Sequence, residues 1–267
     1  MNKLGIIGGG KMASAIMKGI INSNWCEGKD IIVSDRNKDL LQKLHDCYNV
    51  NITENNQETV KNAKIILFAV KPFVLRDVLT EVKPYITKEH TVLSIAAGIS
   101  ISTIEEIAGE VPVVRIMPNT PALVNEGMSA VCKGHYAASC HTKTAVEIFK
   151  SVGKVIESEE KYIDIITAIS GSGPAFYYYI IEEIAKAGEK LGLDYETCLK
   201  LSAQTAYGSA KMIMESGVKP EQLIINVTTP DGCTAAGNEV LKENKVSDIL
   251  FETMEKTAKK ANELGKN

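Results

Sequence analysis

A glycine-rich turn near the start of the chain carries the clearest chemical signal in the sequence. Gly8, Gly10 and Ala13 follow the pattern Gly-x-Gly-x-x-Ala, directly after an apolar run and directly before apolar residues at helical spacing. Gly8 would allow a tight reversal, Gly10 would let the backbone approach a diphosphate, and Ala13 would keep the helix close to the strand. A diphosphate would accept hydrogen bonds from the free N–H groups of the helix N-terminus. The turn therefore predicts a dinucleotide site, with a purely structural turn as the alternative.

The end of the next expected strand, within residues 30–37, bears on which dinucleotide would bind. Asp35 could accept a hydrogen bond from the ribose 2'-hydroxyl of NAD(H). Ser34 and Arg36 instead offer a donor and a positive charge to the 2'-phosphate of NADP(H), and Asn37 offers a second donor. We expect NADP(H) to be preferred and NAD(H) to be tolerated. A solvated Asp-Arg turn is the alternative.

Lys71 is a second polar residue that follows a buried strand. The apolar run over residues 63–70 is typical of a parallel strand covered on both faces, and it leads directly to Lys71 and Pro72. Because Pro72 suits the first turn of a helix, Lys71 would lie at the carboxyl end of a sheet strand, where open α/β sheets bind ligands. A solvated loop lysine is an equally good interpretation from the sequence alone.

Two segments in the second half, residues 170–175 and 226–237, are rich in glycine, hydroxyl and other polar residues, and each precedes a helical pattern. A helix N-terminus with small residues and hydroxyls binds carboxylate or phosphate through its backbone N–H groups. Helix capping would explain either segment alone. Two such segments in one domain favour an anion site.

The reaction class follows from the groups that are present. The sequence has neither a Gly-x-Ser-x-Gly elbow nor a His-Glu-x-x-His pair, and its four histidines lie away from the glycine loops. Hydride transfer from a nicotinamide needs none of these groups, because the protein only orients the acceptor and stabilises charge. A ketone acceptor would need a proton donor, for which Lys71 is the loop candidate. A protonated imine would need only backbone N–H groups and threonine hydroxyls.

The elements that position these residues follow from hydrophobic periodicity. Strands and helices alternate to about residue 117, and a further strand, helix and strand are expected up to residue 157. Long helices are then expected over 174–191, 195–216 and 246–264. We predict an α/β fold: a Rossmann-type, doubly wound NAD(P)-binding domain over 1–159, followed by an all-helical substrate-binding and dimerisation domain over 160–267. The alternative to dimerisation is that these helices pack on the protein's own sheet.

Composition excludes several kinds of partner and site. The net charge is −3 and no lysine- or arginine-rich block occurs, which argues against nucleic acid and acidic membranes as partners. Lysines interrupt the only apolar N-terminal stretch, and no run of about 18 apolar residues occurs, so we expect a cytoplasmic protein without a signal peptide. The six cysteines include no Cys-x-x-Cys pair, so neither a metal site nor a disulfide framework is expected.

Six short segments along the chain combine into a recognisable set. They cover residues 7–13, 69–72, 96–98, 117–121, 170–175 and 229–234. Together, and in this order over essentially the whole chain, they resemble the pyrroline-5-carboxylate reductase family. The last segment is the most specific, because the family pattern there is a hydroxyl residue, Pro, any residue, Gly, any residue and Thr at the start of a helix. Thr229 stands where serine is common, and Asp231 stands where glycine is common and would point to solvent or to a basic partner.

The resemblance implies the last step of proline synthesis, the reduction of 1-pyrroline-5-carboxylate to L-proline with NADPH or NADH. It places the substrate between the nicotinamide and the helical domain of a dimer, and such dimers often assemble into decamers. The loop over 229–234 would hold the substrate carboxylate, and Thr234, the catalytic residue, would hydrogen-bond the ring nitrogen. The expected substrate-binding residues are Glu160, Ser172, Gly173, Asn226, Thr229, Gly232, Cys233 and Thr234. The expected cofactor-binding residues are Gly8, Gly9, Gly10, Lys11, Met12, Ser34, Asp35, Arg36, Asn56, Ala69, Val70, Lys71 and Ala97.

Two other functions remain as alternatives. A hydroxyacid dehydrogenase of the 6-phosphogluconate type also joins a Rossmann domain to a helical one, but it would place an asparagine one turn after a helical lysine, whereas Lys186 is followed by Lys190. A dinucleotide-sensing regulatory protein would bind NADP without turnover. Such a sensor would have no need of a second anion site beside the nicotinamide.

Overall fold

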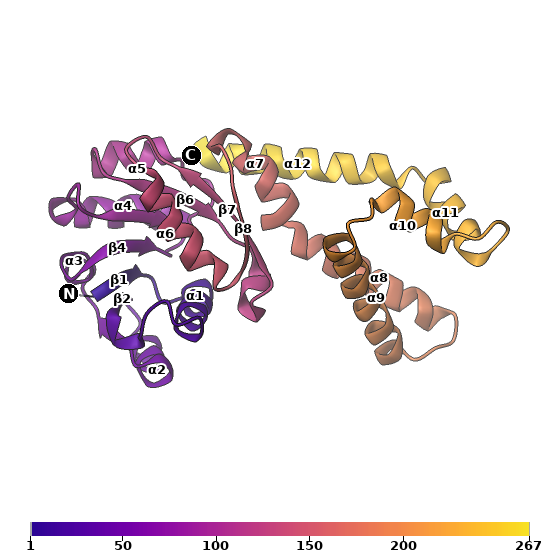
Figure 1. Cartoon of the computed structure of the whole chain (residues 1–267), viewed down its shortest axis with the longest axis horizontal. Helices are drawn as coiled ribbons and strands as arrows, with labels where there is room; N and C mark the ends of the chain where they lie inside the picture. The colour runs from indigo at the N-terminus through magenta and orange to yellow at the C-terminus, as the bar shows by residue number, and fades with distance from the viewer. Residues whose placement is uncertain (1, 267) are drawn as a thin grey trace. The chain divides into compact units, whose positions relative to one another are not determined.

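The computed structural model describes residues 2–266 of the chain, which form two compact units (Figure 1). The first unit contains the residues up to Ser172 and those from Thr257 onward, and the second contains Gly173–Lys256. The boundary expected from the sequence divided the chain between residues 159 and 160. Backbone contacts group residues 160–172 and the end of the chain with the first unit.

The first unit is built on one eight-stranded sheet. Its strands are β1 (Asn2–Ile7), β2 (Ile31–Ser34), β3 (Asn51–Thr53), β4 (Ala63–Phe68), β5 (Thr91–Ser94), β6 (Val113–Met117), β7 (Gly127–Lys133) and β8 (Gly153–Glu157). The strand order is β3-β2-β1-β4-β5-β6-β7-β8, and every neighbouring pair is parallel except β6 and β7. The order reverses between β1 and β4, which pair directly. In an open α/β sheet this reversal marks the crevice in which ligands bind.

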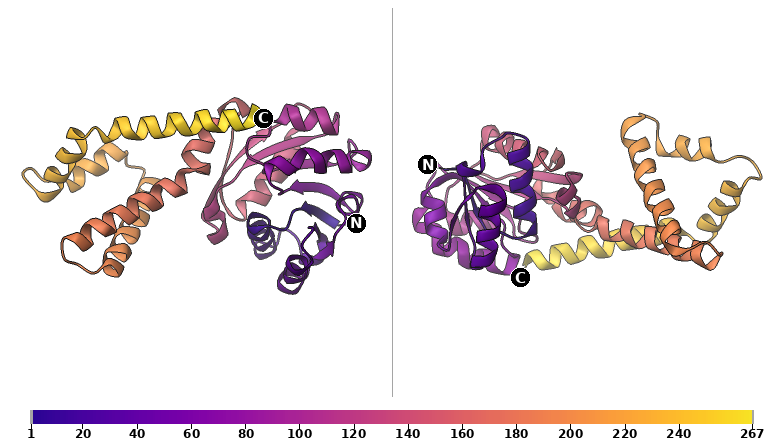
Figure 2. Two further views of the ribbon diagram at one scale, coloured as in Figure 1. Left: turned by 180° about the vertical axis from the view of Figure 1, so that it is seen from behind. Right: turned by 90° about the horizontal axis from the view of Figure 1, so that it is seen from below.

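Helices cover both faces of the sheet (Figures 1 and 2). Those of the first unit are α1 (Lys11–Asn22), α2 (Lys38–Tyr48), α3 (Asn56–Lys61), α4 (Pro72–Val82), α5 (Ile101–Ala108), α6 (Ser139–Lys150) and α7 (Ile163–Ile166). Ile6 of β1 packs in one core with α1, α2 and α6, whereas the next residue, Ile7, packs in a second core with α3, α4 and α5. Because successive strand side chains point to opposite faces, these two cores establish the doubly wound sheet that the sequence predicted.

The second unit is entirely helical over the residues with regular structure. It contains α8 (Gly173–Lys190), α9 (Tyr195–Glu215), α10 (Pro220–Val227), α11 (Cys233–Glu243) and the first part of α12 (Val246–Lys266). Helices α8 and α9 lie close together, since Ser202 Oγ donates to the Ile181 carbonyl at 3.0 Å and a Cβ at Gly188 would lie 2.6 Å from Cys198 Sγ. None of the helices in the described part of the chain is long and apolar enough to cross a bilayer.

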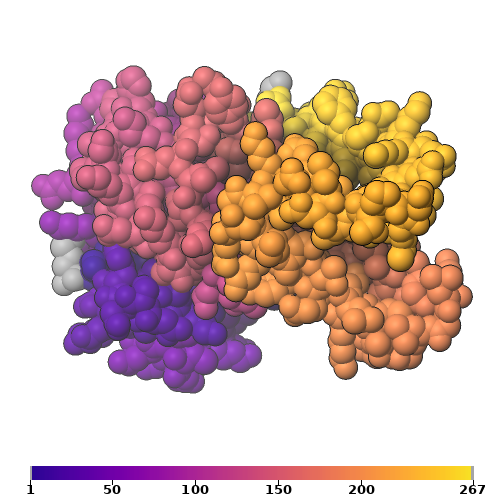
Figure 3. All heavy atoms as spheres, turned by 45° about the vertical axis from the view of Figure 1, so that its right-hand side comes forward, coloured from indigo at the N-terminus to yellow at the C-terminus, as the bar shows by residue number. Residues whose placement is uncertain are grey.

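The second unit buries few of its apolar side chains within this chain. Neither of the two hydrophobic cores found among the described residues includes a residue of Gly173–Lys256. Tyr177 and Tyr179 of α8 and Met214 of α9 are each about two-thirds exposed. Figure 3 shows the heavy atoms of this unit, coloured by residue number. Exposed apolar surface on this scale is typical of a protein interface.

Two local features differ from the sequence predictions. Residues 170–175 were expected to be a loop, but Thr167–Gly171 form a π-helical turn in which the Ser172 N–H donates to the Thr167 carbonyl at 2.8 Å. The turn continues from α7, so the glycines and serines here bend a helical run instead of opening a loop. The short strand β3 (Asn51–Thr53) was not predicted, because three residues give too little alternation to detect.

Candidate active site

The glycine turn has the conformation that the sequence predicted for it. Gly8 has a φ of +99°, and a Cβ there would lie 2.9 Å from the Ala69 carbonyl oxygen, so only glycine fits without strain. A Cβ at Gly9 would lie 2.8 Å from Leu44 Cδ1. Gly10 differs from both, since no heavy atom of the described residues, its chain neighbours aside, lies within 4 Å of a Cβ placed there. The fold itself therefore does not require glycine at position 10, whereas a close ligand would.

Helix α1 begins directly after this turn with a free N-terminus. Gly10 is its N-cap, and no described side chain caps the helix. Helices α2, α5 and α9, in contrast, are capped by the side chains of Asn37, Ser100 and Asp194. Lys11 at the first helical position is exposed and Met12 is half-buried. The first turn of α1 thus offers backbone N–H groups, a positive dipole end and a lysine to an anion.

The Asp35 carboxylate is already engaged by backbone N–H groups. Its Oδ2 accepts from the Gly9 N–H at 2.7 Å, and its Oδ1 accepts from the Asn37 N–H at 2.9 Å. Asp35 therefore ties the end of β2 to the glycine turn, and the Gly9 N–H is not free for a diphosphate. Arg36, in contrast, is exposed, and its guanidinium has no hydrogen-bond or ion-pair partner among the described residues.

Ser34 does not face the surface at the end of β2, as its expected role required. The residue is fully buried, and its Oγ donates to Asn56 Oδ1 at 2.8 Å. The Asn56 Nδ2 in turn donates to Glu81 Oε2 at 3.0 Å. Asn56, which is half-buried at the first position of α3, thus lies between Ser34 and Glu81 in a row of hydrogen bonds. The sequence could not show this, because the acceptor that a short hydroxyl finds depends on the packing of a distant helix.

The remaining expected cofactor residues follow β4 and β5 at the same edge of the sheet. Ala69 and Val70 are half-buried directly after β4. Lys71 is the N-cap of α4, is exposed, and has no side-chain partner among the described residues. Ala97 is exposed in the loop between β5 and α5. Because β1, β4 and β5 are parallel neighbours, their following loops lie side by side at one edge of the sheet.

The N-terminus of α11, in the second unit, resembles that of α1 in starting from a glycine N-cap without a side-chain cap. Gly232 is the N-cap of α11, and no described side chain caps this helix. A Cβ at Gly232 would lie 2.2 Å from Thr229 Oγ1, so glycine lets the threonine turn back over the helix start. Cys233 and Thr234 are exposed in the first turn, and the Thr234 hydroxyl has no partner among the described residues. This end of α11 combines backbone N–H groups with free hydroxyls, the donors that a small carboxylate needs.

The other expected substrate residues have local partners. Asn226 is exposed near the end of α10, and its Oδ1 accepts from Gln222 Nε2 at 2.9 Å. Ser172 and Gly173 lie at the π-helical turn where α8 begins. Asp231 has a φ of +55° and is exposed, so its carboxylate lies in solvent beside the α11 start. That position agrees with one of the two orientations expected for it.

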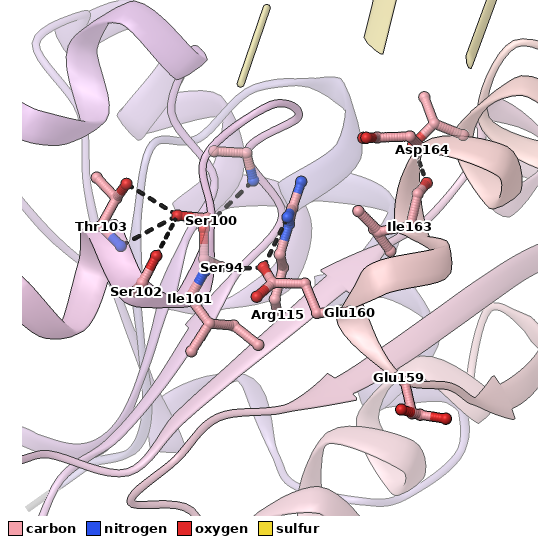
Figure 4. Close-up of polar contacts among 12 residues, drawn as sticks. Ser94, Ser100, Ile101, Ser102, Thr103, Arg115, Glu159, Glu160, Ile163 and Asp164 are labelled. Atoms are coloured by element: carbon pink, nitrogen blue, oxygen red, sulfur yellow. Dashed lines mark hydrogen bonds and ion pairs between the residues drawn. The ribbon is translucent and has the colours of Figure 1, made fainter. Parts of the chain in front are cut away.

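Glu160 takes part in a structural ion pair (Figure 4). Its Oε1 accepts from Arg115 Nη1 at 2.7 Å and from the Ile101 N–H, at the start of α5, at 2.8 Å. Arg115 is buried, and its Nε has no partner among the described atoms. Sequence reasoning missed Arg115, although one arginine inside the apolar strand Val113–Met117 was the signal for a buried, paired charge.

Comparison with known proteins identifies the family of the chain. Residues 160–264 match a family model described as pyrroline-5-carboxylate reductase dimerisation. Residues 3–98 match one described as NADP oxidoreductase, coenzyme F420-dependent. The pyrroline-5-carboxylate reductase of Methanosarcina acetivorans is 38% identical over 265 residues, which are 99% of this chain and 98% of that protein. The chain belongs to the pyrroline-5-carboxylate reductase family.

Solved structures of this family have the same fold. A pyrroline-5-carboxylate reductase from Coxiella burnetii is 33% identical, with a TM-score of 0.94 over 100% of this chain and 99% of that one. The Plasmodium falciparum pyrroline carboxylate reductase, solved with NADP bound, is 35% identical, with a TM-score of 0.88 over 99% of this chain and 98% of that one. These matches favour a pyrroline-5-carboxylate reductase over the hydroxyacid dehydrogenase and the dinucleotide sensor.

Proposed function

We propose that this chain reduces 1-pyrroline-5-carboxylate to L-proline, with NADPH as the preferred hydride donor and NADH as a tolerated one. The observation that carries the proposal is a pair of helix N-termini, at α1 and at α11, that each start from a glycine N-cap without a side-chain cap, in a member of this family. The first suits a diphosphate and the second a carboxylate. When bound, the nicotinamide supplies the hydride that adds to the C=N carbon, and the ring nitrogen becomes the amine of proline.

The first unit would hold the cofactor at the edge where β1, β4 and β5 end. The α1 N-terminus and Lys11 would bind the diphosphate, and the Gly10 backbone would approach it closely. Arg36 would bind the 2'-phosphate, which supports a preference for NADPH because its guanidinium is exposed and has no partner among the described residues. Lys71 and Ala97, at the ends of β4 and β5, would lie nearer the nicotinamide.

The second unit would hold the substrate. The N–H groups at the start of α11 and the Thr229 hydroxyl would bind the carboxylate, and the free Thr234 hydroxyl would hydrogen-bond the ring nitrogen. Hydride addition removes the positive charge of a protonated imine, so Thr234 orients the ring and does not have to stabilise new charge. Asn226, Ser172 and Gly173 would complete the site.

Replacing Thr234 tests this assignment. Thr234→Val keeps the shape of the side chain and removes its hydroxyl, and we expect turnover to fall about 10- to 100-fold, the value of one hydrogen bond to a charged group. The affinity for NADPH, measured without substrate, should not change. Thr234→Ser is the matched control and should keep most of the activity. Equal turnover in the valine variant and the unaltered chain would remove Thr234 from the reaction.

We also propose that the helical domain over 160–267 associates with a second copy, and that such dimers assemble further into decamers. The exposed apolar side chains of α8 and α9 support self-association, since a lone chain would leave them in water. Sedimentation equilibrium tests this proposal, and a mass equal to one chain would contradict it. The cytoplasm, and the lack of nucleic-acid and membrane partners, remain predictions from composition.

A further inference from the structure

The end of helix α12 packs directly on the loop between β5 and α5. Gly98 in this loop has a φ of +75°, and a Cβ there would lie 3.2 Å from both the carbonyl carbon and the carbonyl oxygen of Leu264. A Cβ at Gly265 would lie 3.0 Å from the Gly98 carbonyl oxygen. The two backbones thus touch at two glycines, one from the loop and one from the last turn of the helix. All these residues belong to the first unit.

A side-chain hydrogen bond fixes the same turn of α12 from another direction. Asn262 Nδ2 donates to Asp164 Oδ2 at 2.8 Å. Asp164 lies in α7, four residues after Glu160, which accepts from the N–H of Ile101 where the loop enters α5 (Figure 4). A polar cavity of about 300 Å³ lies among these groups, and Gly98, Asp164 and Asn262 are among its lining residues. One side of the loop is therefore open to water, so contacts with neighbouring elements must hold it.

The loop follows a strand at the edge of the sheet where the cofactor would bind. Ala97, the residue before Gly98, is exposed and is an expected cofactor contact. Its own side chain is a methyl group and forms no hydrogen bond, so its position depends on the backbone of Gly98 and on what Gly98 touches. The contact at Gly98 is the backbone of Leu264 and Gly265.

We propose that the last turn of α12, from Asn262 to Gly265, is a positioning element that sets the backbone of Ala97 and Gly98 for NADPH. The inference rests on the proposed function in one respect, the assignment of the Ala97 loop to the cofactor. Helix α12 begins in the second unit and ends in the first, so one continuous helix joins the unit proposed for self-association to the loop proposed for the cofactor.

Gly265→Ala is the first test. The new methyl group would lie 3.0 Å from the Gly98 carbonyl oxygen, so the loop must shift by a few tenths of an ångström. Alanine also favours a helix more than glycine does, so the helix itself is not weakened. We expect the dissociation constant for NADPH, titrated by its fluorescence without substrate, to rise about fivefold, because small displacements of a bound group are costly. The KM for pyrroline-5-carboxylate at saturating NADPH should not change. Glu263→Ala, at an exposed residue in the same turn, is the matched control and should bind NADPH as the unaltered chain does.

A charge exchange at Asn262 is the second test. Asn262→Asp replaces the donor of this hydrogen bond with a carboxylate, which repels the carboxylate of Asp164. We expect NADPH binding to weaken about threefold, as the loss of one exposed hydrogen bond would predict. Asp164→Asn combined with Asn262→Asp restores a carboxylate–amide pair and should bring the affinity to within about twofold of the original. If the pair served stability alone, Asn262→Asp would lower the melting temperature, and the double exchange would not restore the NADPH affinity.

Unchanged NADPH affinity in both Gly265→Ala and Asn262→Asp would overturn the proposal. Both measurements are made without substrate, so they do not depend on turnover. If the unaltered chain binds NADPH but does not reduce pyrroline-5-carboxylate, the proposed function fails while the positioning role is still decided by the titrations. If Gly265→Ala does not fold, the exchange of Asp164 and Asn262 decides the question alone.

Discussion

Replacing Gly10 with alanine should separate ligand binding from folding. Gly10 has φ −65° and ψ −177°, which alanine adopts readily, and no heavy atom of the described residues, its chain neighbours aside, lies within 4 Å of the new Cβ. The cost to folding is then only the preference for glycine over alanine at an N-cap, about 1 kcal/mol or less. If a diphosphate lies against this backbone, the methyl group must push it away.

The expected loss of affinity is large. Moving a bound group by about 1 Å typically costs on the order of 100-fold, which corresponds to about 2.7 kcal/mol. We therefore expect the dissociation constant for NADPH to rise about 100-fold in Gly10→Ala. The melting temperature should fall by no more than about 4 °C, because 1 kcal/mol shifts it by about 2–4 °C in a protein of this size.

Gly8→Ala is the matched control, because we expect it to lower the stability of the fold instead of the affinity for NADPH. At a φ of +99° an alanine is strained by about 1–2 kcal/mol, and its Cβ would lie 2.9 Å from the Ala69 carbonyl oxygen. The melting temperature should fall by about 2–8 °C. Differential scanning calorimetry and a fluorescence titration with NADPH measure both quantities on both variants. If Gly10→Ala binds NADPH as tightly as the unaltered chain, the diphosphate does not lie at this turn.

Three further outcomes follow from the structure. Arg36→Ala should weaken NADPH about 10-fold and leave NADH unchanged in paired titrations, and an equal loss for both would contradict its assignment to the 2'-phosphate. Glu160→Gln leaves Arg115 without its anionic partner, so the free energy of unfolding in urea should fall by about 2–4 kcal/mol; a raised KM for substrate with unchanged stability would instead place Glu160 in the substrate site. Burial raises the pKa of the Cys26 and Cys132 thiols to about 11. The unfolded thiols ionise near pH 9, while the folded ones stay protonated up to about pH 11. Their contribution to stability is therefore fully present below pH 9 and is lost between about pH 9 and 11. This decline, followed by urea titrations, should be smaller when both cysteines are alanine; identical curves would refute the shifts.

The sheet and the glycine turn could be predicted because their signals are local. The run over 63–70 is apolar on both faces, and the glycines follow a strand and precede a helix, so short-range pattern and geometry agree. The direction of β7 was not predicted from the sequence. The connection over 118–126 is too short for a parallel crossover, which needs about a dozen residues, and β6 and β7 are antiparallel as a result.

The roles of single side chains could not be predicted in the same way. Ser34 and Asp35 are neighbours in the sequence, but one is buried against Asn56 and the other binds the Gly9 N–H. Each partner lies more than twenty residues away. The π-helical turn at Thr167–Gly171 shows the same limit, because continuity with α7 outweighs the loop preference of glycine and serine.

The oxidation of NADPH by the purified chain in the presence of 1-pyrroline-5-carboxylate tests the central claim most directly. The loss of nicotinamide absorbance should be matched mole for mole by L-proline, and NADH should support a slower reaction. Thr234→Val should bind NADPH normally and oxidise it slowly. If the unaltered chain binds NADPH tightly, yet neither oxidises it with this substrate nor forms L-proline, the chain is not a pyrroline-5-carboxylate reductase in function.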